Sequence, residues 1–112
     1  MQPLAYFLLL QFQRPGHGLL WPFAVLLFDL SNDKLYVRGR GDYAGIADDD
    51  DALVLAETVN QLQADAGAER ASAILDLLES TLSNSVRVTE RIALVAPDIE
   101  ATLDSLSAAF LS

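Results

Sequence analysis

Two long apolar runs, separated by a polar turn, occupy the first thirty residues. Leu4–Phe12 and Leu19–Leu30 are rich in aromatic and branched side chains, a composition typical of strands covered on both faces. Residues 14–18 between them are Arg-Pro-Gly-His-Gly, and the glycines permit a tight reversal. Pro22 has no N–H for a sheet ladder, so it marks the first residues of the second strand or a bulge. We therefore predict a buried β-hairpin whose second strand is regular over Phe23–Leu30.

Two further stretches alternate between apolar and polar positions. After the turn residues 31–34, Leu35–Arg40 places Leu35 and Val37 on one face, and Tyr36, Arg38 and Arg40 on the other. The second alternating stretch predicts a fourth strand with Val86, Val88, Ile92 and Leu94 on one face. Glu90 falls on the apolar phase of that strand and so points inward, unless a β-bulge turns it outward.

Three stretches have the spacing of an amphipathic helix. The first follows four consecutive aspartates, Asp48–Asp51, and Gly67 stands at its C-cap position. The second runs from about Ala68 to Leu82, and the third opens at Pro97-Asp98. Their apolar faces are, in turn, Leu55, Val59, Leu62 and Ala66; Ala71, Ile74, Leu75, Leu78 and Leu82; and Ile99, Leu103, Leu106 and Phe110.

The order of elements is three strands, two helices, a strand and a helix. This order indicates an α+β fold, with an antiparallel sheet of about four strands and helices packed on one face. A chain of 112 residues can form one real hydrophobic core without disulfides or metals, so we predict a single domain over residues 1–112.

Composition adds an expectation about surfaces. Hydrophobic residues make up 52% of the chain, which is high for a small soluble domain, so we expect apolar surface buried against another subunit in a homo-oligomer. The chain has no cysteine, and no Lys or Arg precedes the first apolar run, which favours a cytoplasmic protein without a signal peptide. A membrane helix over the hairpin would bury Gln11, Gln13 and Arg14, so we expect no membrane contact.

Charge is divided unevenly along the chain. The net charge is −9, and residues 48–112 hold three arginines against thirteen carboxylates. An acidic surface of this kind repels phosphates, so we expect no nucleic-acid partner.

The aspartate run has two interpretations. Carboxylate oxygens are ligands for hard cations, but the spacing is not that of an EF-hand loop. We favour a capping role, with Asp50 or Asp51 as N-cap, and expect no metal. No nucleotide-binding, nucleophile-elbow or zinc-protease motif is present, so we expect no cofactor and consider an enzyme the weaker class.

Four arginines are the other candidate chemistry. Arg38, Arg40, Arg87 and Arg91 lie on the polar faces of the third and fourth strands. If these strands are neighbours, the guanidinium groups can hold a phosphate or carboxylate beside Glu90. An inward-pointing Glu90 would have either a raised pKa or an arginine partner. The alternative is that the arginines pair with the abundant acidic residues of the helices.

Phe28-Asp29 with Leu35–Arg38, and Leu77–Ser83 with Val86–Arg91, resemble a family of small bacterial proteins classed only as a domain of unknown function. The resemblance implies a bacterial origin and a protein that acts beside others encoded with it. It carries no activity or site residues onto this chain.

Excess apolar content without a catalytic constellation leads to the functional prediction. We predict a non-enzymatic module that binds another protein, itself included, through a strand edge or a helix face. Trp21 and Phe23 are the predicted anchors, unless both are ordinary core residues. The alternative function is an anion-binding or catalytic module that uses the four arginines beside Glu90 and Tyr36.

Overall fold

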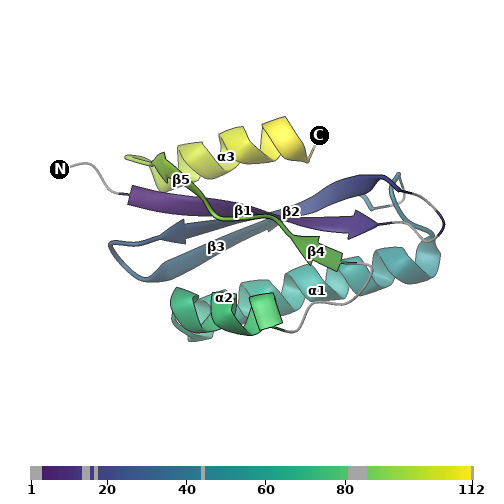
Figure 1. The fold of residues 1–112 in the computed structure, drawn as a ribbon, viewed down its shortest axis with the longest axis horizontal. Coiled ribbons are helices and arrows are strands. Elements are labelled where there is room, and N and C mark those ends of the chain that lie inside the picture. The colour runs from purple at the N-terminus through teal and green to yellow at the C-terminus, as the bar shows by residue number, and fades with distance from the viewer. Residues whose placement is uncertain (1–3, 14–15, 17, 44, 81–85, 112) are drawn as a thin grey trace.

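The computed structural model describes residues 4–13, 16, 18–43, 45–80 and 86–111 (Figure 1). Within these residues, five strands and three helices follow the predicted α+β order, except that the fourth predicted strand is split in two. The elements are β1 (Leu4–Gln13), β2 (Leu20–Asp29), β3 (Lys34–Gly39), α1 (Asp49–Ala68), α2 (Ala71–Ser80), β4 (Val86–Val88), β5 (Ile92–Val95) and α3 (Ile99–Phe110). Three residues of the predicted first turn (14, 15 and 17) and Leu82 lie outside the described residues.

The hairpin of β1 and β2 forms the centre of an antiparallel sheet. The strand order is β3-β2-β1-β4. β5 also pairs directly with β1, at residues 4–7, whereas β4 pairs with residues 10–12 of β1. Leu10 pairs with Ala24 while Gln11 pairs with Pro22, so Phe23 is one extra residue in β2. This is the bulge that proline allowed, and the carbonyl oxygen of Phe23 accepts a hydrogen bond from the backbone N–H of Arg40 at 3.0 Å.

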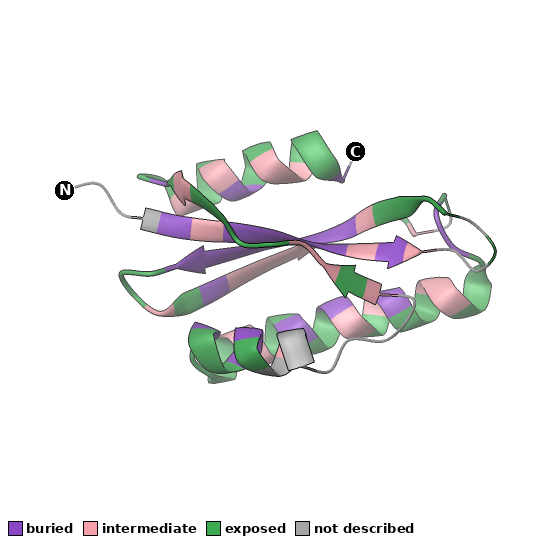
Figure 2. Ribbon diagram, viewed as in Figure 1, coloured by how far each residue is buried: buried purple, intermediate pink, exposed green. Residues whose placement is uncertain are grey.

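Helices cover both faces of the sheet, which corrects the expectation of helices on one face. In Figure 1, α1 and α2 lie below the sheet and α3 lies above it. Because β1 and β2 are apolar on both faces, both faces need cover. Leu8, Leu10 and Leu26 belong to the core that α1 and α2 enclose, and Phe7, Leu9 and Leu27 to the core under α3. Figure 2 shows the buried positions running along these central strands.

Gly39 sets how closely α1 approaches the sheet. A Cβ added at Gly39 would lie 2.8 Å from Cγ1 of Val59 and 2.7 Å from the hydroxyl oxygen of Tyr43. Val59 is a buried residue of the predicted apolar stripe on α1. The absence of a side chain at position 39 therefore lets this stripe pack directly on β3.

Helix α1 begins at a cap from the aspartate run. Asp48 is the N-cap, and its side chain accepts a hydrogen bond from the N–H of Asp51 at 2.9 Å. The capping interpretation is confirmed, although Asp50 and Asp51 lie in the first turn rather than at the cap. Gly67 does not end the helix, because its φ is not positive; Glu69 is the C-cap.

The second helix is tied to the β2–β3 turn. Asp33 has a left-handed backbone with φ of 50°. Its carbonyl oxygen accepts from the N–H of Ala71 at 3.1 Å, and its carboxylate accepts from the N–H of Ser72 at 3.2 Å. Arg70 Nε donates to the same carboxylate at 2.5 Å. A turn residue thus accepts hydrogen bonds from two of the free N–H groups at the start of α2, those of Ala71 and Ser72.

In the described part of the chain, none of the helices combines the length and apolarity needed to cross a membrane.

Candidate functional site

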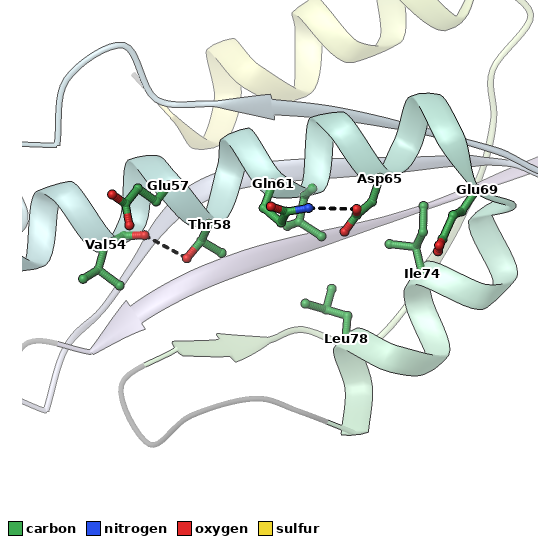
Figure 3. A pocket seen from close by; sticks show the side chains of 9 residues that line it. Val54, Glu57, Thr58, Gln61, Asp65, Glu69, Ile74 and Leu78 are labelled. Atoms are coloured by element: carbon green, nitrogen blue, oxygen red, sulfur yellow. Dashed lines mark hydrogen bonds between the residues drawn. The ribbon is translucent and has the colours of Figure 1, made fainter.

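A groove of about 440 Å³ lies between α1 and α2 (Figure 3). Its lining comes from α1, from the residue that caps α1, and from α2. The lining residues are Val54, Glu57, Thr58, Gln61, Leu62, Asp65, Glu69, Ile74 and Leu78. This volume lies within the range of pockets that hold small molecules or the side chains of a partner.

The groove exists because α1 has two stripes at helical spacing. Leu55, Val59 and Leu62 face the sheet and are buried. The neighbouring stripe starts at Val54 and continues with Thr58, Gln61 and Asp65, at positions i, i+4, i+7 and i+11. This second stripe lines the groove on the α1 side, and Ile74 and Leu78 line it on the α2 side.

Apolar side chains form the floor and one end of the groove. Leu62 is 7% exposed and Ile74 is 3% exposed, so both are held rigidly by the core below. Figure 3 shows Ile74 and Leu78 pointing from α2 towards α1. Val54 is 55% exposed at the end of the groove, next to Leu53, which is 62% exposed. A partner that covered Val54 would remove this apolar surface from water.

The rim of the groove is acidic. Glu57, Asp65 and Glu69 line it, and the side chain of Gln61 donates to Asp65 at 3.0 Å. Residues 49–80 contain eight carboxylates and one basic residue, Arg70, whose guanidinium group binds Asp33. The groove therefore combines apolar floor contacts with a negative potential, an arrangement that selects cationic partners.

The described residues include no group of three or more His, Cys, Asp or Glu side chains that could hold a metal ion. The lining of the groove is made of aliphatic, amide, hydroxyl and carboxylate side chains. These side chains can make apolar contacts and hydrogen bonds with a bound partner.

The four predicted arginines do not meet on one surface. The strands that carry them are not neighbours, because β2 and β1 separate β3 from β4. Arg38 instead pairs with two acidic residues of α3, Asp104 and Glu100, the latter at 3.7 Å. Arg40 Nη1 donates to the carbonyl oxygen of Pro22 at 3.3 Å, where it supports the β2 bulge. The arginine cluster required a pairing of strands that the fold does not contain.

At the opposite edge, Arg87 on β4 lies opposite Gln11 of β1 in the strand register. Arg91 is an exposed residue before β5. Glu90 is exposed as well, and a register shift explains why. Leu10 pairs with Val88 and Phe7 pairs with Ile92, so the β4–β5 segment holds one more residue than β1.

This bulge gives β4 and β5 opposite phases. Val86 and Val88 pack in the core under α1 and α2, whereas Leu94 packs in the core under α3. The inward position of Glu90 on a single alternating strand is therefore wrong, and the alternative, a β-bulge that turns Glu90 outward, is confirmed. Thr89 supports the bulge, because its backbone N–H donates to Leu9 O at 3.0 Å and its hydroxyl accepts from Leu9 N–H at 2.9 Å.

The two predicted aromatic anchors have different environments. Phe23 is 0% exposed and belongs to the core, because the bulge turns its side chain towards α1 and α2; this corrects its assignment to an interface. Trp21 is 38% exposed, next to Leu19 and Leu20, which are 63% and 40% exposed. Trp21 therefore remains available to a partner at the end of the hairpin.

The chain matches no family model, no curated protein and no solved structure. Its resemblance to small bacterial proteins of unknown function therefore stays a prediction, and the functional argument depends on the geometry of the chain itself.

Sequence reasoning missed the groove. Its one signal was the pair Leu53 and Val54, two apolar residues beside the predicted buried stripe of α1, and both are more than half exposed in the structure. Two adjacent apolar residues outside a helix's core face indicate a second contact surface.

Proposed function

We propose that this protein is an interaction module that binds a basic, apolar segment of another protein in the groove between α1 and α2. The observation that carries the proposal is the combination in one groove of a rigid apolar floor, an exposed Val54 and three rim carboxylates. Neither an apolar floor nor an acidic rim would alone select this class of partner.

An amphipathic helix is the partner segment that fits this groove. The groove runs along two helices, and helices commonly bind such grooves through apolar side chains at positions i, i+3 or i+4, and i+7. In this arrangement, apolar side chains of the partner would contact Leu62, Ile74 and Val54. Lys or Arg side chains flanking them would face Glu57 and Asp65.

Charge contributes selectivity and speed of association more than affinity. The rim carboxylates are exposed or half-exposed, so each ion pair with a partner is screened by water. The many carboxylates of residues 49–80 act together at a distance, attracting cationic segments and repelling acidic ones. The apolar contacts then supply most of the binding energy.

The anion-binding alternative receives less support from the geometry. Arg38 and Arg40 lie near one edge of the sheet and Arg87 near the other, and the guanidinium group of Arg38 is bound to α3. A phosphate would have no set of converging donors among these side chains.

The test uses a matched pair of variants on α1. Val54→Glu places a charge inside the groove, whereas Leu53→Glu places the same charge one residue away, outside the groove lining. Both positions are exposed, so neither substitution disturbs the core. Binding of a fluorescent 15-residue amphipathic Leu/Lys peptide is followed by anisotropy, with a Leu/Glu peptide of the same pattern as negative control.

We expect the wild-type protein to bind the Leu/Lys peptide and not the Leu/Glu peptide. Val54→Glu is expected to weaken binding about tenfold, because the floor loses an apolar contact at the point of entry. Leu53→Glu is expected to bind as tightly as wild type or slightly more tightly. Equal responses of the two variants would mean that the peptide binds by charge alone, and the groove would not be its site.

A further inference from the structure

The two edges of the sheet differ in how they are protected. At the β3 edge, the side chain of Gln63 on α1 donates to the carbonyl oxygen of Val37 at 3.2 Å. Lys34 and Arg38 add charges along the same strand. Occupied backbone groups and charged side chains are the usual devices that prevent an edge strand from pairing with another chain.

At the opposite edge, β5 itself carries no charged side chain. Ile92 to Pro97 is a run of six uncharged residues. Ile92 is 47% exposed and Val95 is 48% exposed, and within the described residues no strand pairs with the outer side of β5. An uncharged, exposed and apolar edge strand is a template for β-pairing.

Helix α3 extends the apolar surface on the face of β5 that carries Ile92, whereas Val95 points to the opposite face. The ring of Phe110 lies 5.9 Å from the ring of Phe7, and Phe7 is the residue of β1 that pairs with Ile92. Phe110 is itself 36% exposed. We call Ile92, Val95 and Phe110, together with the outer backbone of β5, the β5 strip.

We infer that the β5 strip is the contact surface for a second copy of this chain, which pairs β5 with β5 in antiparallel orientation. A two-fold axis perpendicular to the sheet at Ala93 would join two sheets into one continuous sheet and place Ala93 of one copy opposite Ala93 of the other. Each strip would then meet an identical strip, so uncharged residues meet uncharged residues.

Charge at the ends of the strip selects this arrangement. Arg91 precedes β5 and Asp98 follows it, so an antiparallel pairing keeps Arg91 of one copy apart from Arg91 of the other, and Asp98 apart from Asp98. A parallel pairing would place like charges together. Thr89, Glu90 and Arg91 lie between β4 and β5, outside the ladder with β1.

Net charge also favours this surface over others for self-association. Two copies with a net charge of −9 repel each other, most strongly where the acidic helices α1 and α2 would meet. The β5 strip lies at the sheet edge, where pairing of backbone groups needs no charged contact.

The first test is the mass of the protein in solution, measured by sedimentation equilibrium over a range of concentrations. Wild type is expected to be a dimer. Val95→Lys places a charge in the strip and is expected to shift the dimer dissociation constant upward by about a hundredfold, which gives a monomer at micromolar concentration. Leu53→Lys, the same substitution at an exposed apolar position of α1, is expected to leave the dimer unchanged.

The second test does not depend on the folding of Val95→Lys. The chain has no cysteine, so a single Ala93→Cys substitution at the centre of β5 reports contact between copies. Mild oxidation is expected to give a disulfide-linked dimer, whereas Ala101→Cys, exposed on α3, is expected to stay monomeric under the same conditions.

A monomeric wild type, or a dimer that Val95→Lys leaves intact, would overturn the inference, as would equal cross-linking of the two cysteine variants. The result is independent of groove binding: Val95→Lys is expected to bind the Leu/Lys peptide as wild type does. Loss of dimerisation and loss of peptide binding are therefore separate outcomes.

Discussion

Asp33 shows how a single side chain connects two parts of the fold. It lies in the β2–β3 turn with a left-handed backbone, which Asp and Asn tolerate better than most residues. The hydrogen bond from Arg70 is the main cause that lowers the pKa of the Asp33 carboxyl below its ordinary value of 3.8, and hydrogen bonds from Ser72 act in the same direction. The folded state therefore favours the charged form of this residue.

This lowered pKa predicts a pH dependence of stability. Because the folded pKa lies below the unfolded one, the contribution of Asp33 is fully present above the unfolded pKa and is lost as pH falls through the folded pKa. Asp33→Asn keeps the backbone preference and removes the charge. In urea denaturation, wild type is expected to be more stable than Asp33→Asn at pH 7, and the difference is expected to shrink below about pH 4. The exposed Asp76→Asn serves as control, and a pH-independent difference would contradict this prediction.

Thr89 stabilises the bulge between β4 and β5 through its side-chain hydroxyl. Its hydroxyl accepts the N–H of the buried residue Leu9, where the bulge interrupts the ladder between β1 and the β4–β5 segment. Thr89→Val keeps the shape and removes the acceptor, so one buried N–H loses its partner. We expect a loss of about 1–3 kcal/mol in the free energy of unfolding. Thr89→Ser retains the hydroxyl and is expected to lose less; equal losses would mean that packing, not the hydrogen bond, is responsible.

At the scale of elements, the contact of α1 with β3 depends on Gly39. Gly39→Ala introduces a Cβ at 2.8 Å from the buried Val59 Cγ1, so either the side chain or the helix must move. We expect a destabilisation of about 1–3 kcal/mol, measured by urea denaturation. In a Val59→Ala background, the same substitution is expected to cost less, because the clashing methyl groups are gone. Equal costs in the two backgrounds would show that the approach of α1 is not set by this contact.

The order of the elements and the buried stripe of α1 followed directly from the periodicity of apolar residues. Two things did not follow. The bulge between β4 and β5 changes which face each half of the fourth predicted strand presents; Glu90 on the apolar phase allowed a bulge in the sequence but did not require one. The apolar runs of β1 and β2 indicated that both faces of the sheet need cover. They did not indicate which helix covers which face, because that depends on the path of the chain from β5 to α3.

The candidate sites were harder to predict than the fold, for a related reason. An arginine cluster required β3 and β4 to be neighbours, and strand order is a property of the whole sheet rather than of either strand. The groove likewise depends on the spacing between α1 and α2. Local pattern showed that Val54 was apolar and outside the core stripe, but not that α2 would leave space beside it.

At the scale of the whole molecule, the acidic groove and the uncharged β5 strip are separate surfaces. The groove lies in the layer of α1 and α2, and the strip lies at one edge of the sheet. No residue that lines the groove belongs to the β5 strip. Two linked grooves can bind a partner with two basic segments more tightly than one groove does.

The acidic surface predicts a response to salt. The carboxylates of residues 49–80 attract a cationic peptide before the two molecules touch. Salt weakens this long-range attraction, because the Debye length is only about 10 Å at 0.1 M salt. We expect the association rate of the Leu/Lys peptide, measured by stopped-flow anisotropy, to fall severalfold between about 20 mM and about 300 mM NaCl. The dissociation rate, which reflects the apolar contacts, is expected to change little. The opposite pattern would mean that close ion pairs hold the peptide.

Amide chemical shifts report, residue by residue, whether the groove between α1 and α2 is a binding site. Addition of the Leu/Lys peptide to ¹⁵N-labelled protein is expected to shift the signals of Val54, Gln61, Ile74 and Leu78, and to leave those of α3 unchanged. Small shifts spread evenly over α3, β3 and the helices would contradict the claim, because they would show contact with the acidic surface in general and no preference for the groove.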